Sequence, residues 1–272
     1  MSLRAVYCDL DGTLLGRGAS LVHDGEGRFT LLGVRALEAC DRAEAEVVLY
    51  SGRRRAQVFE DARLIGQRSY IFEAGAGLVL DGELEWLTGD LLPTDHATIF
   101  EQITASGAPG LLLDRYAGRL EYHAPWHVDR EVSHLFRGLV DAMEADALLA
   151  EHDLGHLRLV DNGNVARREY LTGLDQTRAY HLVPAAASKA RAVARHMHAR
   201  GYERDECIAV GDSREDMGAA GAVGTFWLVA NALERDPTLR DAIAAHPNVR
   251  VAEASYGEGV YEAVVTTLAG RR

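Results

Sequence analysis

Lysine is almost absent from this sequence. Of its 29 basic residues one is a lysine, Lys189, and the other 28 are arginines. Codon bias in a GC-rich genome accounts for an excess of arginine but not for the lysine that remains. The lysine ammonium is a compact point charge on a flexible stem, whereas the arginine guanidinium is a planar fork. Lys189 therefore marks a position where a point charge is needed, although a solvated helix lysine stays an alternative.

Cysteine and long apolar runs are also scarce. Cys8, Cys40 and Cys207 are too few and too scattered for a disulfide framework or a zinc cluster, which indicates buried free thiols. No window approaches roughly eighteen uninterrupted apolar residues, so we expect no membrane-spanning helix. The N-terminus leads straight into an apolar strand and not into a basic, signal-like segment. These absences predict a cytoplasmic protein that does not act at a membrane.

The chain carries an excess of negative charge. Its 29 basic and 41 acidic residues give a net charge of −12, which argues against nucleic acid or an anionic membrane as a partner. With 47% apolar and 26% charged residues, the 272-residue chain has a globular composition and room for one large domain or two smaller ones. An acidic protein that binds a phosphate ester needs a metal ion and locally placed cations.

Short apolar strands alternate with helical patterns in two separate blocks of the chain. This alternation is typical of an α/β fold, and it predicts a doubly wound, Rossmann-like parallel sheet. Residues 12–30 are rich in glycine and predict a loop or flap. The first block has predicted strands at 5–8, 46–50 and 69–72 and helices at 31–45 and 54–65. The second has helices at 185–200, 232–244 and 259–269 and strands at 206–210, 223–229 and 249–251.

A different pattern separates these blocks. Asp81-Gly82 predicts the two-residue turn of a hairpin, and the following segment mixes helices and strands as an α+β unit does. We therefore predict a core of residues 1–81 and 184–272 with an inserted α+β cap of residues 82–183. Within the cap we expect helices at 94–105, with Thr94 as N-cap, and at 132–143. Strands are expected at 110–113, 120–123, 157–160 and 179–183, with a turn at 162–164.

Two carboxylates directly follow the first strand, Ala5 to Cys8. Alternate residues of a strand share a face, so we expect Asp9 and Asp11 to point at the same small volume. Two carboxylates held so close repel each other unless a cation lies between them or one is protonated. Because Asp-Gly is also a common turn pair, these residues alone are equally consistent with a solvated turn.

Other polar residues follow further strands or lie in the helix after the cap. Ser51 follows strand 46–50, Asp212 and Asp216 follow strand 206–210, and Lys189 lies in the helix at 185–200. Open α/β sheets bind ligands at the carboxyl ends of their strands. We therefore expect these side chains to converge with Asp9 and Asp11. A turn residue at Ser51, a helix N-cap at Asp212 and a first-turn acid at Asp216 remain structural alternatives.

Taken in order, these residues resemble the haloacid dehalogenase superfamily of phosphohydrolases. The insertion lies between the second and third motifs, after Glu73-Ala74-Gly75-Ala76, and resembles the type IIB cap of Cof-type, sucrose-phosphate, trehalose-phosphate and mannosyl-phosphoglycerate phosphatases. Glu215 departs from the family pattern, which often has asparagine there. The matching motifs are Asp9-Leu10-Asp11-Gly12-Thr13, Ser51-Gly52-Arg53, Lys189 and Gly211-Asp212-Ser213-Arg214-Glu215-Asp216.

The resemblance implies a Mg²⁺-dependent phosphatase that works through an aspartyl-phosphate. Asp9 is then the nucleophile and Asp11 the general acid and base. Lys189 offsets the negative charge of Asp9 and of the phosphoryl group, which Ser51 and Gly52 also grip. Mg²⁺, which prefers oxygen ligands, is held by Asp9, Asp212 and the backbone carbonyl of Asp11. Asp216 then orients Lys189 or a metal-bound water without binding the metal itself.

The expected substrate is a small phosphorylated metabolite, a sugar phosphate or a phosphoglycerate-linked sugar. Two alternatives remain: a phosphosugar mutase with the same aspartyl-phosphate chemistry, and a catalytically silent metabolite-binding protein. The pairs His123/His127 and His152/His156 have metal-like spacing but no third ligand nearby, so we expect surface or cap-core histidines. Most of the cap arginines should be solvated, and one or two could reach a carboxylate or phosphate of the substrate. The arginines concerned are Arg115, Arg119, Arg130, Arg167, Arg168 and Arg178.

Overall fold

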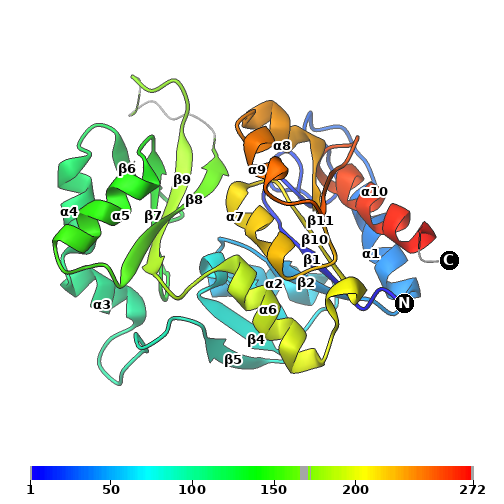
Figure 1. The fold of residues 1–272 in the computed structure, drawn as a ribbon, viewed down its shortest axis with the longest axis horizontal. Coiled ribbons are helices and arrows are strands. Elements are labelled where there is room, and N and C mark those ends of the chain that lie inside the picture. The colour runs from blue at the N-terminus through cyan, green and yellow to red at the C-terminus, as the bar shows by residue number, and fades with distance from the viewer. Residues whose placement is uncertain (1, 166–170, 172, 271–272) are drawn as a thin grey trace.

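The computed structural model describes residues 2–165, 171 and 173–270. Over these ranges the chain forms one sheet of eight strands and another of four (Figure 1). The large sheet has the order β12-β11-β10-β1-β2-β3-β4-β5, and the small sheet, here called the cap sheet, has the order β6-β7-β9-β8. The predicted α/β core with an inserted α+β cap is confirmed.

Parallel pairing builds the centre of the large sheet, as predicted. Its parallel strands are β1 (Ala5–Cys8), β2 (Glu46–Tyr50), β3 (Tyr70–Phe72), β10 (Cys207–Gly211), β11 (Thr225–Leu228) and β12 (Val249–Val251). The hairpin of β4 (Gly77–Leu80) and β5 (Glu83–Trp86) adds two antiparallel strands at one edge. A parallel strand that is covered on both faces has a continuous run of apolar residues, and this is why the sequence predicted these strands.

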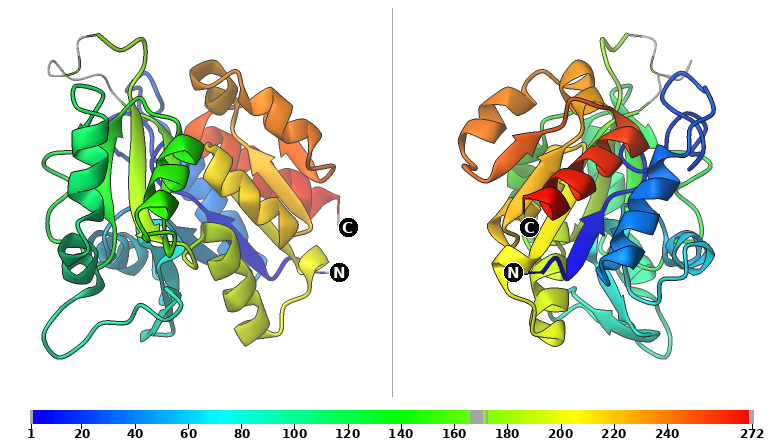
Figure 2. Two further views of the ribbon diagram at one scale, coloured as in Figure 1. Left: turned by 60° about the vertical axis from the view of Figure 1, so that its left-hand side comes forward. Right: turned by 90° about the vertical axis from the view of Figure 1, so that its right-hand side faces the viewer.

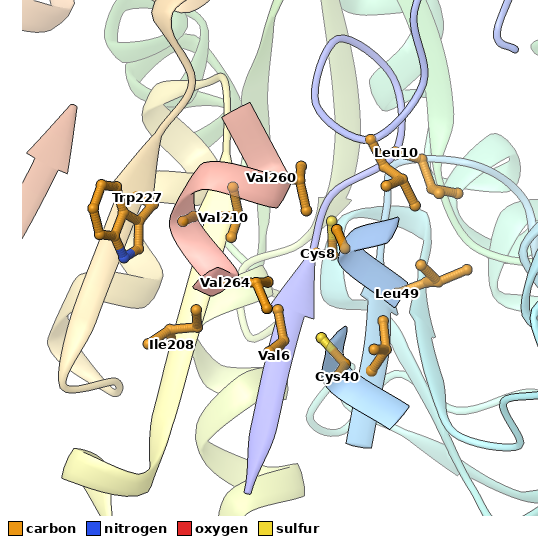
Figure 3. Packing of buried hydrophobic residues seen from close by; sticks show 14 of the residues in the cluster. Val6, Cys8, Leu10, Cys40, Leu49, Ile208, Val210, Trp227, Val260 and Val264 are labelled. Atoms are coloured by element: carbon orange, nitrogen blue, oxygen red, sulfur yellow. The ribbon is translucent and has the colours of Figure 1, made fainter. Parts of the chain in front are cut away.

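Alternate residues of β1 enter two different hydrophobic clusters. Val6 and Cys8 pack with α1 (Leu32–Arg42), α2 (Arg55–Leu64) and α10 (Tyr256–Ala269), as Figure 3 shows for part of this cluster. Helices α1 and α10 lie side by side although they come from opposite ends of the chain (Figure 2). Ala5 and Tyr7 pack on the other face with α6 (Lys189–Arg200), α7 (Arg214–Met217), α8 (Ala230–Arg235) and α9 (Leu239–Ala244).

The helix predicted over 232–244 is wrong as a single element, because α8 and α9 are separate helices. Pro237 lies between them. Proline disfavours a helical conformation of the preceding residue and lacks the N–H that a continuous helix requires. Short 3₁₀ turns complete the core at η1 (Glu73–Gly75), η3 (Arg204–Glu206) and η4 (Gly218–Gly221).

The cap sheet turns one face to helices and the other toward the core. Phe136, Tyr180 and Leu182 pack in a hydrophobic cluster with the helices, whereas the alternate residues Leu135 and His181 line a cavity. The antiparallel strands of this sheet are β6 (Leu120–Tyr122), β7 (His134–Gly138), β8 (Leu157–Asn164) and β9 (Arg178–Pro184), and its helices are α3 (Ile99–Ala105), α4 (Ala108–Arg115) and α5 (Ala142–Glu151).

The predicted helix over 132–143 is wrong, because β7 occupies its centre. All five residues of β7 are buried. A short strand with both faces covered shows no alternation of apolar and polar residues, so its apolar positions also fit a helical period. The next helix, α5, begins only at Ala142, after the N-cap Asp141.

Three further details of the cap differ from expectation. The strand predicted at 110–113 lies within α4 instead, and the turn predicted at 162–164 lies within β8, next to an irregularity in its pairing with β9. The N-cap of α3 is Thr98 and not Thr94, because Thr98 and Glu101 form a capping box. In such a box the side chains of Thr98 and Glu101 each accept a hydrogen bond from the backbone N–H of the other residue, which stabilises a helix start at Thr98 more than a single threonine side chain would.

The predicted division between core and cap stays a prediction, although β5, which lies beyond its boundary at residue 81, pairs within the large sheet. Among the described helices, none has the length and apolar character required to span a membrane.

Candidate active site

A cavity of about 530 Å³ lies between the cap sheet and the strand ends of the large sheet. The core contributes Asp9, Asp11, Ser51 and Asp212 to its lining. Strands β1 and β10 are parallel neighbours in which Cys8 pairs with Val210, so Asp9 and Asp212 follow adjacent strands at the same edge. From the cap come Trp126, Arg130, Leu135, Asn162, Ala179 and His181.

Lys189 lies at the centre of a buried acidic cluster. Its Nζ is 2.8 Å from Asp9 Oδ1 and 2.6 Å from Asp216 Oδ1. Carboxylate oxygens of Asp9, Asp212 and Asp216 all lie within 4.8 Å of one another. The side chain of Lys189 is only 1% exposed and its ammonium lies 5.0 Å from the centre of the Tyr50 ring. The structure thus brings together four residues that the sequence had singled out.

The acidic groups of this cluster outnumber its buried cation. Burial raises the pKa of Asp9 to about 7, and the charge of Asp216 adds to this while Lys189 opposes it. Burial, together with Asp9 and Asp216, also raises the pKa of Asp212 well above its ordinary value. Burial lowers the pKa of Lys189, but its two carboxylate partners outweigh this and keep the ammonium charged. Uncompensated carboxylates of this kind fit a divalent cation.

The oxygens of Asp216 are already occupied. Oδ2 accepts hydrogen bonds from Asp212 N, Ser213 N and Ser213 Oγ, while Oδ1 accepts from Lys189. The Asp212 carboxylate, in contrast, accepts a single side-chain hydrogen bond from the described residues, from Arg235 Nη1 over 3.4 Å. The residues with carboxylate oxygens left for a metal ion are therefore Asp9 and Asp212, and Asp216 positions Lys189.

Gly12 allows the loop after β1 to pass directly against Asp212. Its φ is +90°, and a Cβ at this position would collide with Asp212 Oδ2. For the Mg²⁺-dependent phosphatase expected from the sequence, Gly12→Ala should lower turnover by at least about tenfold, because the methyl group displaces the Asp212 carboxylate and strains the backbone.

Gly18→Ala is the matched control for this change. Gly18 also has a positive φ, +71°, but nothing lies within 4 Å of its added Cβ. It should therefore show a comparable loss of thermal stability with little loss of turnover. Equal turnover in the two variants would contradict the role given to Gly12.

Asp11 also lines the cavity but lies apart from the acidic cluster. Arg53 holds its carboxylate in a bidentate ion pair, with both N–O distances 2.6 Å, and also binds Asp61 at 2.8 Å. The Asp11 side chain is 57% exposed, against 6% for Asp9. Asp9 and Asp11 therefore line one cavity in different surroundings.

The loop after β2 is covered by the cap. Ser51 is 2% exposed, and its Oγ accepts a hydrogen bond from Arg53 N. Arg130 Nη1 donates to the carbonyl oxygen of Gly52 over 3.1 Å. A Cβ at Gly52 would lie 2.6 Å from His181 Nε2 and 3.0 Å from Asn162 Nδ2. This loop has no room for a side chain at Gly52.

The cap arginines divide into buried and exposed groups. Arg130 is buried and lines the cavity, whereas Arg178 is buried in ion pairs with Asp161 and with Asp236 of the core. Arg115 and Arg119 are exposed, as expected for solvated residues, and Arg167 and Arg168 lie outside the described residues.

The histidine pairs and Glu215 are also located. His152 and His156 are exposed, His127 packs on the Tyr122 ring, and His123 lines the cavity. Glu215, the departure from the family motif, accepts hydrogen bonds from Arg158 of the cap (3.3 Å) and from the backbone N–H of Lys189 (3.4 Å). Glu215 therefore contacts the start of α6 and the cap.

A buried network joining core and cap was missed from the sequence. Glu73 is fully buried, and its carboxylate accepts hydrogen bonds from the backbone N–H groups of Glu131, Val132 and Ser133 and from Ser133 Oγ. The one available signal was an acidic residue directly after the apolar strand β3, and nothing in the sequence named its partners about sixty positions away.

Comparisons with known proteins agree with this architecture. No family model matches the sequence. The phosphoglycolate phosphatase of Methanospirillum hungatei is 24% identical over 263 residues, covering 96% of this chain and 94% of that protein. The sucrose-phosphatase of Synechocystis, whose structure contains sucrose and phosphate, has a TM-score of 0.67 at 15% identity and covers 98% of both chains. A haloacid dehalogenase-like hydrolase from Bacteroides thetaiotaomicron has a TM-score of 0.60 at 17% identity, over 97% of this chain and 99% of that one.

These likenesses run along almost the whole chain, core and cap alike, and the core is the part that carries the motif residues. The chain therefore has the fold of haloacid dehalogenase-like hydrolases with an inserted cap, and its sequence is similar to that of phosphoglycolate phosphatases along almost its whole length.

Proposed function

We propose that this protein is a Mg²⁺-dependent phosphomonoesterase that acts on a small phosphorylated metabolite through an aspartyl-phosphate. The observation that supports this most directly is the buried cluster in which Lys189 bridges Asp9 and Asp216 while Asp212 lies alongside. A carboxylate that is to attack a phosphoryl group needs its own charge and that of the phosphoryl oxygens offset by fixed cations.

Asp9 and Asp212, with the backbone carbonyl of Asp11, would hold Mg²⁺. The bound ion would supply charge compensation for the phosphoryl oxygens, which is the main demand of phosphoryl transfer. Asp216 stays outside the ligand set because its oxygens are bound to Lys189, Ser213 and the Asp212 N–H.

The reaction would proceed in two displacements on phosphorus. In the first, an Asp9 oxygen forms a bond to phosphorus while the bond from phosphorus to the leaving oxygen breaks, and that oxygen takes a proton from Asp11. In the second, water attacks the aspartyl-phosphate, its proton returns to Asp11, and Asp9 is regenerated with release of phosphate. Ser51, the backbone at Gly52 and Lys189 would position the phosphoryl group.

Asp11 lines the cavity, and this proton transfer requires that Arg53 release one of its carboxylate oxygens. It faces the cavity but lies outside the buried cluster, and Arg53 orients its carboxylate through two hydrogen bonds. A group that exchanges protons in both steps benefits from such contact with water. The cap would exclude bulk water from the phosphoryl group during the first step.

The proposed substrates are sugar phosphates and phosphoglycerate-linked sugars, and phosphoglycolate deserves testing because the sequence relatives are named for it. The test is phosphate release from a panel of phosphorylated metabolites, with Mg²⁺ and with EDTA. Stoichiometric, Mg²⁺-dependent release supports the hydrolase. An isomerised phosphosugar without net release would support the mutase instead, and binding without turnover of any substrate, including an aryl phosphate, would support a silent protein.

A further inference from the structure

The cap sheet presents one histidine ring to the cavity beside the phosphate-binding loop. His181 lies on β9, is 1% exposed, and lines the cavity. Its Nε2 is the atom nearest to the point where a Cβ on Gly52 would lie, at 2.6 Å. The other ring nitrogen, Nδ1, lies 3.2 Å from Ser133 Oγ. Whether Nε2 donates or accepts a hydrogen bond therefore depends on whether Ser133 Oγ accepts from Nδ1 or donates to it.

The Ser133 hydroxyl has no proton to give to His181. A hydroxyl has one proton, and Ser133 Oγ donates it to Glu73 Oε2 over 2.8 Å. The Glu73 oxygens already accept three backbone N–H groups, so Glu73 acts as an acceptor only. Arg130 Nη1 donates to the same Ser133 Oγ over 2.9 Å. Toward His181, Ser133 can therefore only accept, and Nδ1 must carry the hydrogen.

The surroundings of His181 favour a neutral ring. Burial lowers its pKa well below the ordinary value, and the positive charges of Arg130 and Lys189 act in the same direction. A neutral imidazole has one N–H and one acceptor nitrogen. With the hydrogen on Nδ1, Nε2 is an acceptor, and it makes no hydrogen bond within the part of the chain that the structure describes.

We propose that His181 selects phosphomonoesters whose leaving alcohol carries a further hydroxyl group, by accepting a hydrogen bond from that hydroxyl at Nε2. The inference rests on the proposed phosphatase function and names the substrate class of the same site: a polyol or sugar phosphate. Asn162 Nδ2 lies on the same side of Gly52, 3.0 Å from where a Cβ would be, and can donate to the oxygen of the same hydroxyl. The carboxylate of phosphoglycolate has no such hydrogen and would place a negative oxygen against the Nε2 lone pair.

Nitrogen NMR of the histidine rings tests the tautomer without any turnover. In the full-length protein with Mg²⁺ near neutral pH, His181 should show a protonated Nδ1 and an unprotonated Nε2, with the signals assigned by their loss in His181→Gln. Ser133→Ala removes the acceptor of Nδ1–H, so a protonated Nε2 should become detectable in that variant. A protonated Nε2 in the wild-type protein would overturn the proposal.

Substrate preference tests the recognition itself. The ratio of kcat/KM for glycerol phosphate to that for propyl phosphate, which lacks the free hydroxyl groups, should exceed one in the wild type and fall about tenfold in His181→Phe. His181→Gln keeps an amide oxygen that can accept a hydrogen bond and should retain part of the preference. Ser133→Ala should lower the ratio as well.

The outcomes separate this inference from the function on which it rests. If the wild type hydrolyses phosphomonoesters but prefers propyl phosphate or phosphoglycolate, the His181 proposal is wrong and the phosphatase stands. If it hydrolyses none of them with Mg²⁺, the proposed function fails, while the NMR experiment still decides the tautomer. Should His181→Phe fail to fold, the wild-type ratio and the NMR experiment are sufficient.

Discussion

Asp9→Asn should abolish turnover, with a loss in kcat on the order of 10⁴-fold or more. An amide oxygen does not attack phosphorus, and the substitution removes the carboxylate that Lys189 holds at 2.8 Å. The measurement is the rate of phosphate release under saturating Mg²⁺ and substrate. In the wild type, acid quenching during turnover should leave a phosphoryl group on the peptide that contains Asp9, and in the variant it should not.

The same substitution should leave the fold intact. Burial raises the pKa of Asp9 and the charge of Asp216 adds to this, so an uncharged amide costs less to bury and the Tm should be unchanged or higher. Asp41→Asn is the matched control, because Asp41 is exposed on α1 and remote from the cavity lining. Near-wild-type turnover of Asp9→Asn would remove Asp9 as the nucleophile.

Lys189→Arg should lower kcat by about 10²- to 10³-fold even though it retains the positive charge. The lysine ammonium fits between Asp9 Oδ1 and Asp216 Oδ1 beneath the Tyr50 ring, at a site only 1% exposed. A guanidinium is wider and planar, so it has to displace at least one of these carboxylates. The measurement is kcat with saturating Mg²⁺, together with the Tm of the variant.

Lys189→Met separates charge from shape. It removes the ammonium between two buried carboxylates, and leaving such charges unpaired costs about 3–5 kcal/mol of stability. We expect this variant to unfold at clearly lower denaturant concentration than Lys189→Arg, which keeps the charge. If Lys189→Arg retains full activity, the compact ammonium is not required and the inference from the single lysine fails.

The core of this protein was readable from the sequence because its strands are buried on both faces. Val6, Tyr7 and Cys8 read as one apolar run although they enter two different clusters, and helical patterns separate this run from the next strand. The polar residues directly after such strands must lie at one sheet edge. That geometry suffices to predict that Asp9, Ser51 and Asp212 meet.

The cap was less readable because its elements are short and their patterns ambiguous. Strand β7 includes two buried polar residues, His134 and Arg137, so neither apolar alternation nor a clean apolar run marks it. Arg137 is neutralised by Glu121 of the neighbouring strand β6, a pairing that exists only once the sheet has formed. Tertiary contacts, and not local preference, therefore decide that segment.

From its sequence alone this chain carries the choice of an α/β core, the order of the motifs and the meeting of Asp9, Lys189 and Asp212. The core and the meeting of Asp9 with Asp212 follow from local patterns and from the way parallel strands end, whereas the place of Lys189 follows from the order of the motifs. Only the tertiary structure decides that Asp11 forms an ion pair with Arg53 and that Glu73 binds the backbone N–H groups just before β7. It also decides that His181 faces Gly52, because such contacts join residues tens of positions apart through hydrogen bonds that leave no periodic trace in the sequence.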